Sequence, residues 1–255
     1  MPFLEAFTPT QLATLASAYF IAALVKGITG VGYSSTCLPI LTLAFGLKDA
    51  LPMVLIPSMA SNVVVMASTG GFVDSARRFW PMLASAAVFV FVGLWTLSAM
   101  QGETAAAVLG VVLVLYVGFA LSSSRARLHF RESHSRRFEP LVGAATGFIN
   151  GLTGSQVMPV VPYLLSINDL PRERFVQASN QSFTLSSVMM FIGLGTHGMV
   201  SVPVVVASVL GLVLVTLGVR IGQRISRFLA PQAFRTAVLL VLATLGLGLV
   251  VRAII

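Results

Sequence analysis

The chain has 255 residues, of which 56% are apolar and only 9% are charged, and its formal net charge is +8. An ordinary soluble domain carries about 25% charged residues, so this composition excludes a soluble enzyme, a nucleic-acid-binding domain and a secreted disulfide-bonded scaffold. It predicts a polytopic membrane protein surrounded by the lipid bilayer, in which an excess of arginine marks cytoplasmic loops. Because residues 1–25 contain no Lys or Arg, we do not expect a signal peptide.

The first apolar segment, residues 10–45, is interrupted by the sequence KGITGVG at 26–32. A polar, glycine-rich break between two apolar arms predicts a helix, an unwound tip and a second helix. Three uninterrupted apolar runs follow, at 50–69, 81–100 and 104–121. Each is close to the roughly 20 residues that cross a bilayer as a helix. Residues 1–121 are therefore predicted to form a first membrane repeat of one broken helical hairpin and three transmembrane helices.

The second half of the chain has the same order of elements. Residues 122–139 are polar and rich in arginine, and we expect them to form a basic cytoplasmic loop. The next apolar segment, 141–167, is interrupted by NGLTGSQ at 150–156. Three more apolar runs follow, at 176–195, 200–219 and 233–255. Residues 140–255 are predicted to form a second membrane repeat with the same elements.

The distribution of positive charge predicts the orientation. Arg-rich loops alternate with loops that lack Arg, and placing the former in the cytoplasm leaves one exception, Lys48, which lies outside beside Asp49. Both termini are then outside, and residues 141–167 enter and leave from the cytoplasm as a hairpin whose arms of about 15 Å reach the midplane. Residues 10–45 enter and leave from outside. Their longer first arm leaves a re-entrant hairpin and two full crossings both open.

The two halves also share short motifs. KGITG at 26–30 aligns with NGLTG at 150–154, Asp49 with Asp169, and the Ser-Asn pair at 61–62 with the Ser-Asn pair at 179–180. Because each hairpin is followed by an odd number of spans, the second half is inverted relative to the first. The sequence therefore predicts an all-α polytopic membrane protein of two inverted repeats, each a broken helical hairpin plus three transmembrane helices. This architecture is typical of secondary transporters.

The two tips and the spans that follow them supply the candidate substrate-binding residues. A helix that starts after an unwound tip has backbone N–H groups without partners, and its dipole favours an anion. Lys26 is the one ionisable residue within these segments away from their ends, so a small anionic substrate is its expected partner. The candidates are Lys26, Gly27, Thr29, Gly30, Gly32 and Ser34 at the first tip, Asn150, Gly151, Thr153, Gly154, Ser155 and Gln156 at the second, and Asn62, Asn180 and Gln181 in the spans.

Each of these assignments has a structural alternative. Gly143, Gly147 and Gly151 have the spacing of a helix-packing motif. Lys26 is also compatible with a helix end whose side chain reaches headgroups or a water-filled vestibule. The polar residues within 176–195 are compatible with hydrogen bonds that hold helices together.

Motifs of several enzyme classes are missing from the sequence. It contains neither a Walker A motif nor a GxSxG nucleophile motif. His129, His134 and His197 lie in predicted loops and do not form a metal-binding set, and the single cysteine, Cys37, excludes an intrachain disulfide. We therefore expect neither an enzyme nor a cofactor.

Both tips resemble the TauE/SafE family of bacterial membrane permeases. The resemblance lies in KGITGVG at 26–32 with Pro39, GFINGLTG at 147–154 with Pro159 and Pro162, and ASNQS at 178–182. It implies export of small sulfur-containing anions such as sulfite or an organosulfonate across the inner membrane of a bacterial cell. The leading hypothesis is a secondary transporter with alternating access to a midplane site between the hairpins. An anion channel and a non-transporting membrane assembly subunit remain alternatives, and a homodimer is left open.

Overall fold

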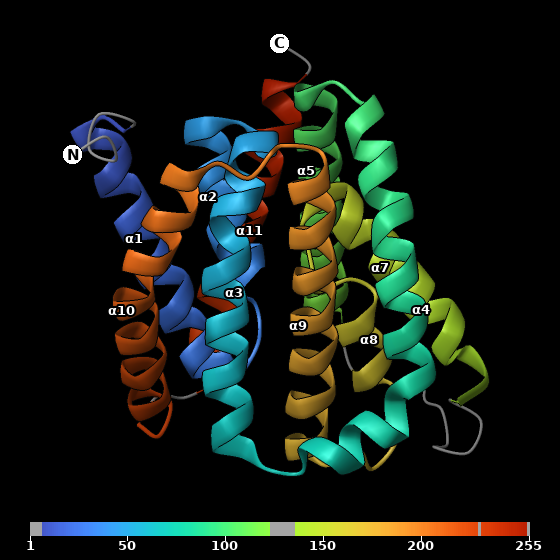
Figure 1. Ribbon diagram of the computed structural model, residues 1–255. Helices are drawn as coiled ribbons and strands as arrows, with labels where there is room; N and C mark the ends of the chain where they lie inside the picture. The colour runs from blue at the N-terminus through green and yellow to red at the C-terminus, as the bar shows by residue number, and fades with distance from the viewer. Residues whose placement is uncertain (1–6, 123–135, 229–230, 254–255) are drawn as a thin grey trace.

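The computed structural model describes residues 7–122, 136–228 and 231–253, and within these ranges every element of regular secondary structure is a helix (Figure 1). The elements are α1 (Pro9–Thr29), α2 (Tyr33–Phe45), α3 (Leu47–Thr69), α4 (Phe72–Ala99), α5 (Gly102–Leu121), η2 (Arg136–Phe138), α7 (Glu139–Thr153), α8 (Val160–Leu165), α9 (Arg172–Thr196), α10 (Val202–Ile225) and α11 (Pro231–Arg252). The predicted all-α fold is confirmed, and each uninterrupted apolar run corresponds to one long helix. Most of the predicted basic loop lies outside the described residues.

Both predicted breaks are present, and each begins at a glycine with a left-handed backbone. α1 ends at Thr29 and is followed by Gly30 at φ 82°, and Gly32, at φ 93°, precedes the first residue of α2. In the second half α7 ends at Thr153, and Gly154 follows it at φ 72°. These φ values are costly for a residue with a Cβ atom. Glycines therefore stand where the chain leaves each helix.

The hairpin arms differ from the expected lengths. α1 has 21 residues, about 31 Å of helix and enough to cross the hydrocarbon, whereas the 13 residues of α2 reach about 20 Å. In the second hairpin α7 has 15 residues but α8 only six, so the returning arm is shorter than predicted. Pro159 explains the short arm, because proline disfavours helical geometry in the residue before it and the helix starts only at Val160.

Five helices of the described chain are long and apolar enough to cross a membrane, namely α1, α3, α4, α5 and α10. α9 has 25 residues and is not among them, and its Gln, Asn and Ser side chains are mostly buried in the protein. α4 begins at Phe72, ahead of the predicted start at 81, and bends at Phe79 (φ −107°, ψ 16°). The bend precedes Pro81, which removes a backbone hydrogen bond and clashes with the preceding turn.

The helices pack in pairs that join the two halves of the chain. α3 and α9 lie side by side in the middle of the bundle (Figure 1), α1 packs against α10, α4 against α7, and α5 against α11. In chain order, α1 of the first half corresponds to α7 of the second, and α4 corresponds to α10. Exchanging the halves therefore converts the α1–α10 pair into the α7–α4 pair and leaves the other two pairs unchanged.

Glycines allow the α4–α7 and α1–α10 pairs, and also the α5–α11 pair, to approach closely. A Cβ atom at Gly143, Gly147 or Gly151 of α7 would lie 2.1–2.2 Å from a backbone oxygen of α4. A Cβ atom at Gly27 of α1 would lie 2.3 Å from the oxygen of Val219 in α10. Both distances are far below van der Waals contact, so any larger residue must push the helices apart. Gly151 therefore serves helix packing, which was the structural alternative for this glycine motif, and Gly27 serves helix packing as well.

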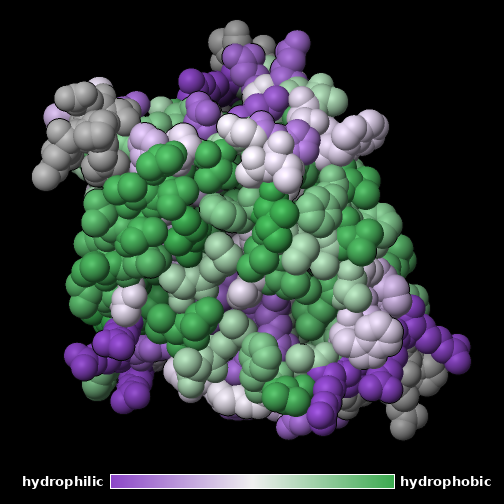
Figure 2. Space-filling view, in the orientation of Figure 1, coloured by the Kyte–Doolittle hydropathy of each residue, from purple (hydrophilic) through white to green (hydrophobic). Residues whose placement is uncertain are grey.

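On the face shown in Figure 2, large apolar residues cover most of the bundle between its polar ends. Trp80, Trp95 and Val213 are between 64% and 71% exposed. Contiguous apolar surface of this kind is unstable in water and is suited to lipid. Together with the five apolar helices it identifies a multi-pass membrane protein.

Candidate substrate-binding site

The centre of the bundle contains a buried cluster of polar side chains, to which we refer as the central cluster: Lys26, Ser34, Ser58, Asn62, Gln156, Asn180 and Ser187. None of them is more than 4% exposed. They come from α1, α2, α3 and α9 and from the tip between α7 and α8. The cluster therefore lies where both broken hairpins meet the central α3–α9 pair.

Lys26 carries the charge of the central cluster. It lies on the last turn of α1 and is 1% exposed, its Nζ donates a hydrogen bond to Oδ1 of Asn62, and the same Nζ lies 5.6 Å from the ring centroid of Phe183. No acidic side chain among the described residues pairs with it. The Nδ2 atom of Asn62 is buried without a hydrogen-bond partner. The cluster thus offers a cation and an amide donor, and both contacts of the cation are to neutral groups.

A chain of hydrogen bonds links the two hairpins through the central cluster. The hydroxyls of Ser34 and Ser58 are 3.0 Å apart, and the Ser58 hydroxyl donates to Oε1 of Gln156 at 3.3 Å. The amide nitrogen of Gln156 is 2.5 Å from Oγ of Ser187 and 3.3 Å from the carbonyl oxygen of Phe183. Gln156 at the second tip is therefore bound to a residue of α3 and to residues of α9, and through Ser58 to the first hairpin.

Asn180 holds the first tip. Its Nδ2 donates to the carbonyl oxygen of Gly30 at 3.1 Å and to that of Val176 at 2.7 Å. A Cβ atom at Gly30 would lie 3.4 Å from Cγ2 of Val176, so the tip packs closely against α9. Oδ1 of Asn180 is buried without a partner. One side chain of α9 thus binds Gly30, the residue that follows the end of α1.

The two tips have the same local hydrogen bonds. The amide of Val31 donates to the hydroxyl oxygen of Thr29 at 3.3 Å, and the amide of Ser155 donates to that of Thr153 at 3.1 Å. Each threonine hydroxyl also lies within hydrogen-bond distance of a carbonyl of its own helix, Val25 for Thr29 and Ile149 for Thr153. Both threonines therefore bind the backbone of their own tips. The amides at 33–35, at the start of α2, have no acceptor within that helix.

Some predicted site residues lie away from the central cluster. The side chain of Gln181 donates to the carbonyl oxygen of Phe72 at 2.7 Å, and Gln177 donates to that of Gly70 at 2.6 Å, so both fasten α9 to the connection between α3 and α4. Gly27 and Gly151 face neighbouring helices, as described above. By contrast, Asn150, which aligns with Lys26 in the shared motif, is fully buried and both its Oδ1 and its Nδ2 lack a partner, so it stays a candidate for contact with the substrate.

Three residues in or against the cluster were not among the candidates. Ser58 and Ser187 belong to the polar faces of α3 and α9, and their spacing from Asn62 and Asn180 was the available signal. Phe183 contributes a ring and a backbone carbonyl, and an aromatic residue in a predicted membrane span gives no sequence signal of this kind.

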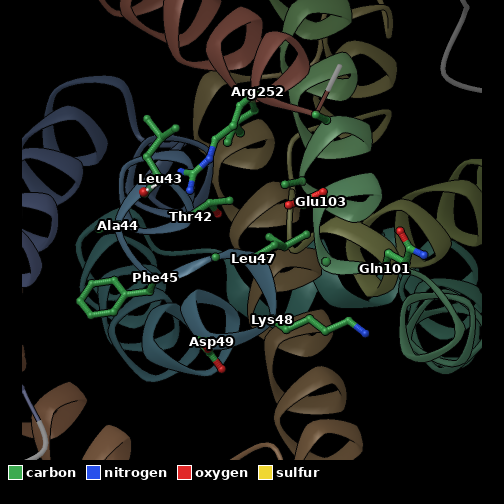
Figure 3. A pocket seen from close by; sticks show the side chains of 15 residues that line it. Thr42, Leu43, Ala44, Phe45, Leu47, Lys48, Asp49, Gln101, Glu103 and Arg252 are labelled. Atoms are coloured by element: carbon green, nitrogen blue, oxygen red, sulfur yellow. Dashed lines mark hydrogen bonds between the residues drawn. The ribbon is translucent and has the colours of Figure 1, made fainter. Parts of the chain in front are cut away.

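Two cavities lie at opposite ends of the bundle, and we name them inner and outer after the orientation predicted from the sequence. The inner cavity, of about 590 Å³, is bordered by the first tip and by Arg172 and Arg227. The outer cavity, of about 660 Å³, is bordered by the α2–α3 connection, the start of α5 and the end of α11 (Figure 3). In Figure 3 Arg252 points towards Leu43, to whose carbonyl oxygen its Nη1 donates at 3.0 Å. α2 borders the inner cavity at Gly32 and Thr36 and the outer cavity from Thr42 onward, with Ser34 in the cluster.

A buried ion pair joins the starts of α4 and α7. Nη1 of Arg78 donates to Oε1 of Glu139, whose side chain is fully buried, and the guanidinium of Arg78 lies 4.7 Å from the ring of Phe79. The second carboxylate oxygen of Glu139 has no partner. The pair therefore stabilises the end of the second hairpin that is predicted to face the cytoplasm. It lies at the opposite end of α7 from the second tip, and so away from the central cluster.

Comparison with known proteins gives one result. The family model described as "Sulfite exporter TauE/SafE" matches residues 15–249. That range contains both tips and every residue of the central cluster. Searches of the curated proteins and of the solved structures gave no match.

Proposed function

Because the chain belongs to the sulfite exporter TauE/SafE family, we propose that it is a secondary transporter that exports small anions, with sulfite and organosulfonates as substrates. The substrate binds at the central cluster, and the protein gives access to it alternately from the two ends of the bundle. The observation that carries this proposal is Lys26, a buried cation whose described contacts are to neutral groups.

The charge of Lys26 supports an anionic substrate. A charge removed from water without a counter-charge costs several kcal/mol, about 2.5–3.5 kcal/mol even on the mildest membrane scales. Asn62 and the ring of Phe183 stabilise the ammonium group only in part. An anion bound between Lys26 and the free Nδ2 of Asn62 supplies the missing charge and an acceptor for the unpaired donor.

The closed cluster between two cavities supports a carrier over a channel. Its side chains are almost completely buried, while the inner and outer cavities approach it from opposite ends along α2. A channel needs a continuous polar path, whereas a carrier passes through a state in which the site is closed to both sides.

The helix pairing supports the inverted repeat. Exchange of the two halves preserves the main helix pairs, and the tips share the same threonine–amide hydrogen bonds. In a transporter of this kind, movement of one repeat against the other opens the site first to one side and then to the other. We place the protein in the inner membrane of a bacterial cell with both termini outside, since the start of α4, the start of α9 and the end of α10 carry arginines at the same end of the bundle (Figure 1).

Counterflow in proteoliposomes tests the function. Vesicles containing the full chain are loaded with unlabelled sulfite, and the uptake of labelled sulfite is followed at several external concentrations. A carrier gives saturable uptake that internal sulfite accelerates. Uptake that rises linearly with concentration, with no effect of internal sulfite, contradicts the carrier and identifies a channel. Absence of flux for sulfite, ethanesulfonate and other small anions contradicts anion transport altogether.

A further inference from the structure

The inner cavity combines apolar walls with basic residues. Val161, Leu239 and Leu242 line it and are 3–4% exposed, whereas Arg172 and Arg227, which also line it, are exposed. None of its lining residues is acidic. Neither guanidinium has a hydrogen-bond or ion-pair partner among the described residues. The cavity thus presents two unpaired cations beside a buried apolar surface.

This combination fits a particular kind of ligand. An inorganic anion would use the two arginines and leave the apolar walls in contact with water. An organic anion with a short apolar group places its head against the arginines and its tail against the walls, so both surfaces lose contact with water at once. The volume of about 590 Å³ is within the range of small-molecule sites.

We propose that the inner cavity is a loading site for organic anions with a short apolar group, in which Arg172 and Arg227 bind the anionic head. The proposal rests on the anion export proposed above, because the bound anion next moves to Lys26. The loading site is distinct from the central cluster, since none of the cluster side chains lines the cavity.

The first tip separates the loading site from the central cluster. Thr29, Val31 and Gly32 line the inner cavity, and Gly30 between them accepts a hydrogen bond from Asn180 of the cluster. Gly30 and Gly32 both have left-handed φ angles, so the glycine on each side of Val31 lacks a Cβ atom that would restrict a change of backbone conformation. Release of the Asn180 hydrogen bond and movement of this three-residue segment would join the cavity to the cluster.

Calorimetric binding of alkylsulfonates tests the loading site. The probes are methanesulfonate, ethanesulfonate, propanesulfonate and butanesulfonate, titrated into the full chain in phosphatidylcholine nanodiscs. Each added methylene is expected to tighten binding by up to about fourfold, the factor that corresponds to full burial of one methylene. The variant Arg172→Gln/Arg227→Gln should weaken butanesulfonate binding by about tenfold, since an exposed ion contact contributes at most about fivefold.

Arg224→Gln is the matched control. Arg224 is also exposed, lies one turn from Arg227 at the end of α10 and does not line the cavity, so this variant should bind butanesulfonate like the wild type. An affinity that does not change with chain length, or an equal loss in Arg224→Gln, overturns the loading site. Loss of butanesulfonate binding when phosphatidylglycerol replaces phosphatidylcholine also overturns it, because the occupant is then a lipid headgroup.

The same variants separate the loading site from the transport function. If the wild type transports anions while Arg172→Gln/Arg227→Gln leaves the binding of butanesulfonate and the half-saturation concentration of its transport unchanged, export stands and the loading site fails. If no anion is transported but butanesulfonate binding still requires the two arginines, the loading site stands and export fails. The loading site and anion export both stand if Lys26→Met abolishes transport but still binds butanesulfonate in a way that requires Arg172 and Arg227.

Discussion

Replacement of Lys26 with methionine removes the charge of the central cluster and keeps most of the side-chain volume. A hydrogen bond to a charged group contributes about 1.5–3 kcal/mol, which corresponds to a loss of roughly 10- to 150-fold in anion affinity. Asn62 and Phe183 cannot replace this contribution, because both are neutral and already contact the ammonium group. We expect the half-saturation concentration for sulfite to rise by this factor, or flux to become undetectable.

The effect of Lys26→Met on stability should have the opposite sign. Removal of a buried, unpaired charge relieves a desolvation cost of several kcal/mol. Against this, Oδ1 of Asn62 loses its donor, which costs about 1–3 kcal/mol. The melting temperature of the purified protein should therefore stay near that of the wild type or rise. The double variant Lys26→Met/Asn62→Leu, which removes the unpaired amide as well, should be more stable than Lys26→Met.

The assay is the initial rate of labelled sulfite uptake in proteoliposomes, measured with the thermal unfolding of the same preparations. Lys48→Met is the matched control, since Lys48 is the only other lysine and lies at the outer cavity. Its half-saturation concentration should change less than about fivefold, because Lys48 is half-buried at the rim of a cavity and lies outside the central cluster. Wild-type kinetics in Lys26→Met would refute the assignment of Lys26 to the substrate. A clearly lower melting temperature in Lys26→Met would show that its role is structural.

Three further substitutions test separately the packing of α7 against α4, the charge of the central cluster and the ion pair between Arg78 and Glu139. Gly151→Ala should destabilise the protein by about 1–3 kcal/mol in thermal or denaturant unfolding, because its Cβ atom would lie 2.1 Å from a backbone oxygen of α4, whereas Gly118→Ala, with nothing within 4 Å, should not. Gln156→Glu should lower sulfite flux at least tenfold in the proteoliposome assay, since its carboxylate supplies the negative charge that the substrate would bring. Glu139→Leu should lower stability by about 3–5 kcal/mol by removing the buried carboxylate that binds Arg78, and Arg78→Met/Glu139→Leu should regain most of this loss in the same unfolding measurement.

The breaks at the two tips could be predicted because they combine three local signals. Glycines at 30 and 154 permit a left-handed backbone, threonines at 29 and 153 bind the following turn, and the apolar arms on both sides set these polar residues apart from the rest of the segment. Lys26 and Asn62 could likewise be named as candidates, since charge and amide groups in a span require partners. Each of these inferences depends on a few neighbouring residues or on a rule about membrane depth.

Contacts between distant segments could not be predicted in the same way. Gly151 belongs to a motif that also contains tip residues, and only the position of α4 decides that it packs against a helix. Phe183 enters the site through its position opposite Lys26, which depends on how α9 rotates about its own axis. The ion pair of Arg78 with Glu139 joins the starts of α4 and α7, which are far apart in the sequence because the rest of α4 and all of α5 lie between them. Pairing of this kind is a property of the packed bundle, and one sequence contains no direct record of it.

The difference between Lys26 and Asn150 indicates how the site treats its substrate. The two residues align in the motif shared by the two halves of the chain, both are buried, and only one is charged. Two lysines would double the desolvation cost of the empty site and would favour binding of a second anion or of a more highly charged one. A single cation matches a single negative charge, while the unpaired Oδ1 and Nδ2 of Asn150 leave an acceptor and a donor for the uncharged part of the ligand. Asn150→Lys should therefore shift the preference of transport from monoanionic sulfonates towards dianions such as sulfate, and equal preference in both proteins would contradict this account.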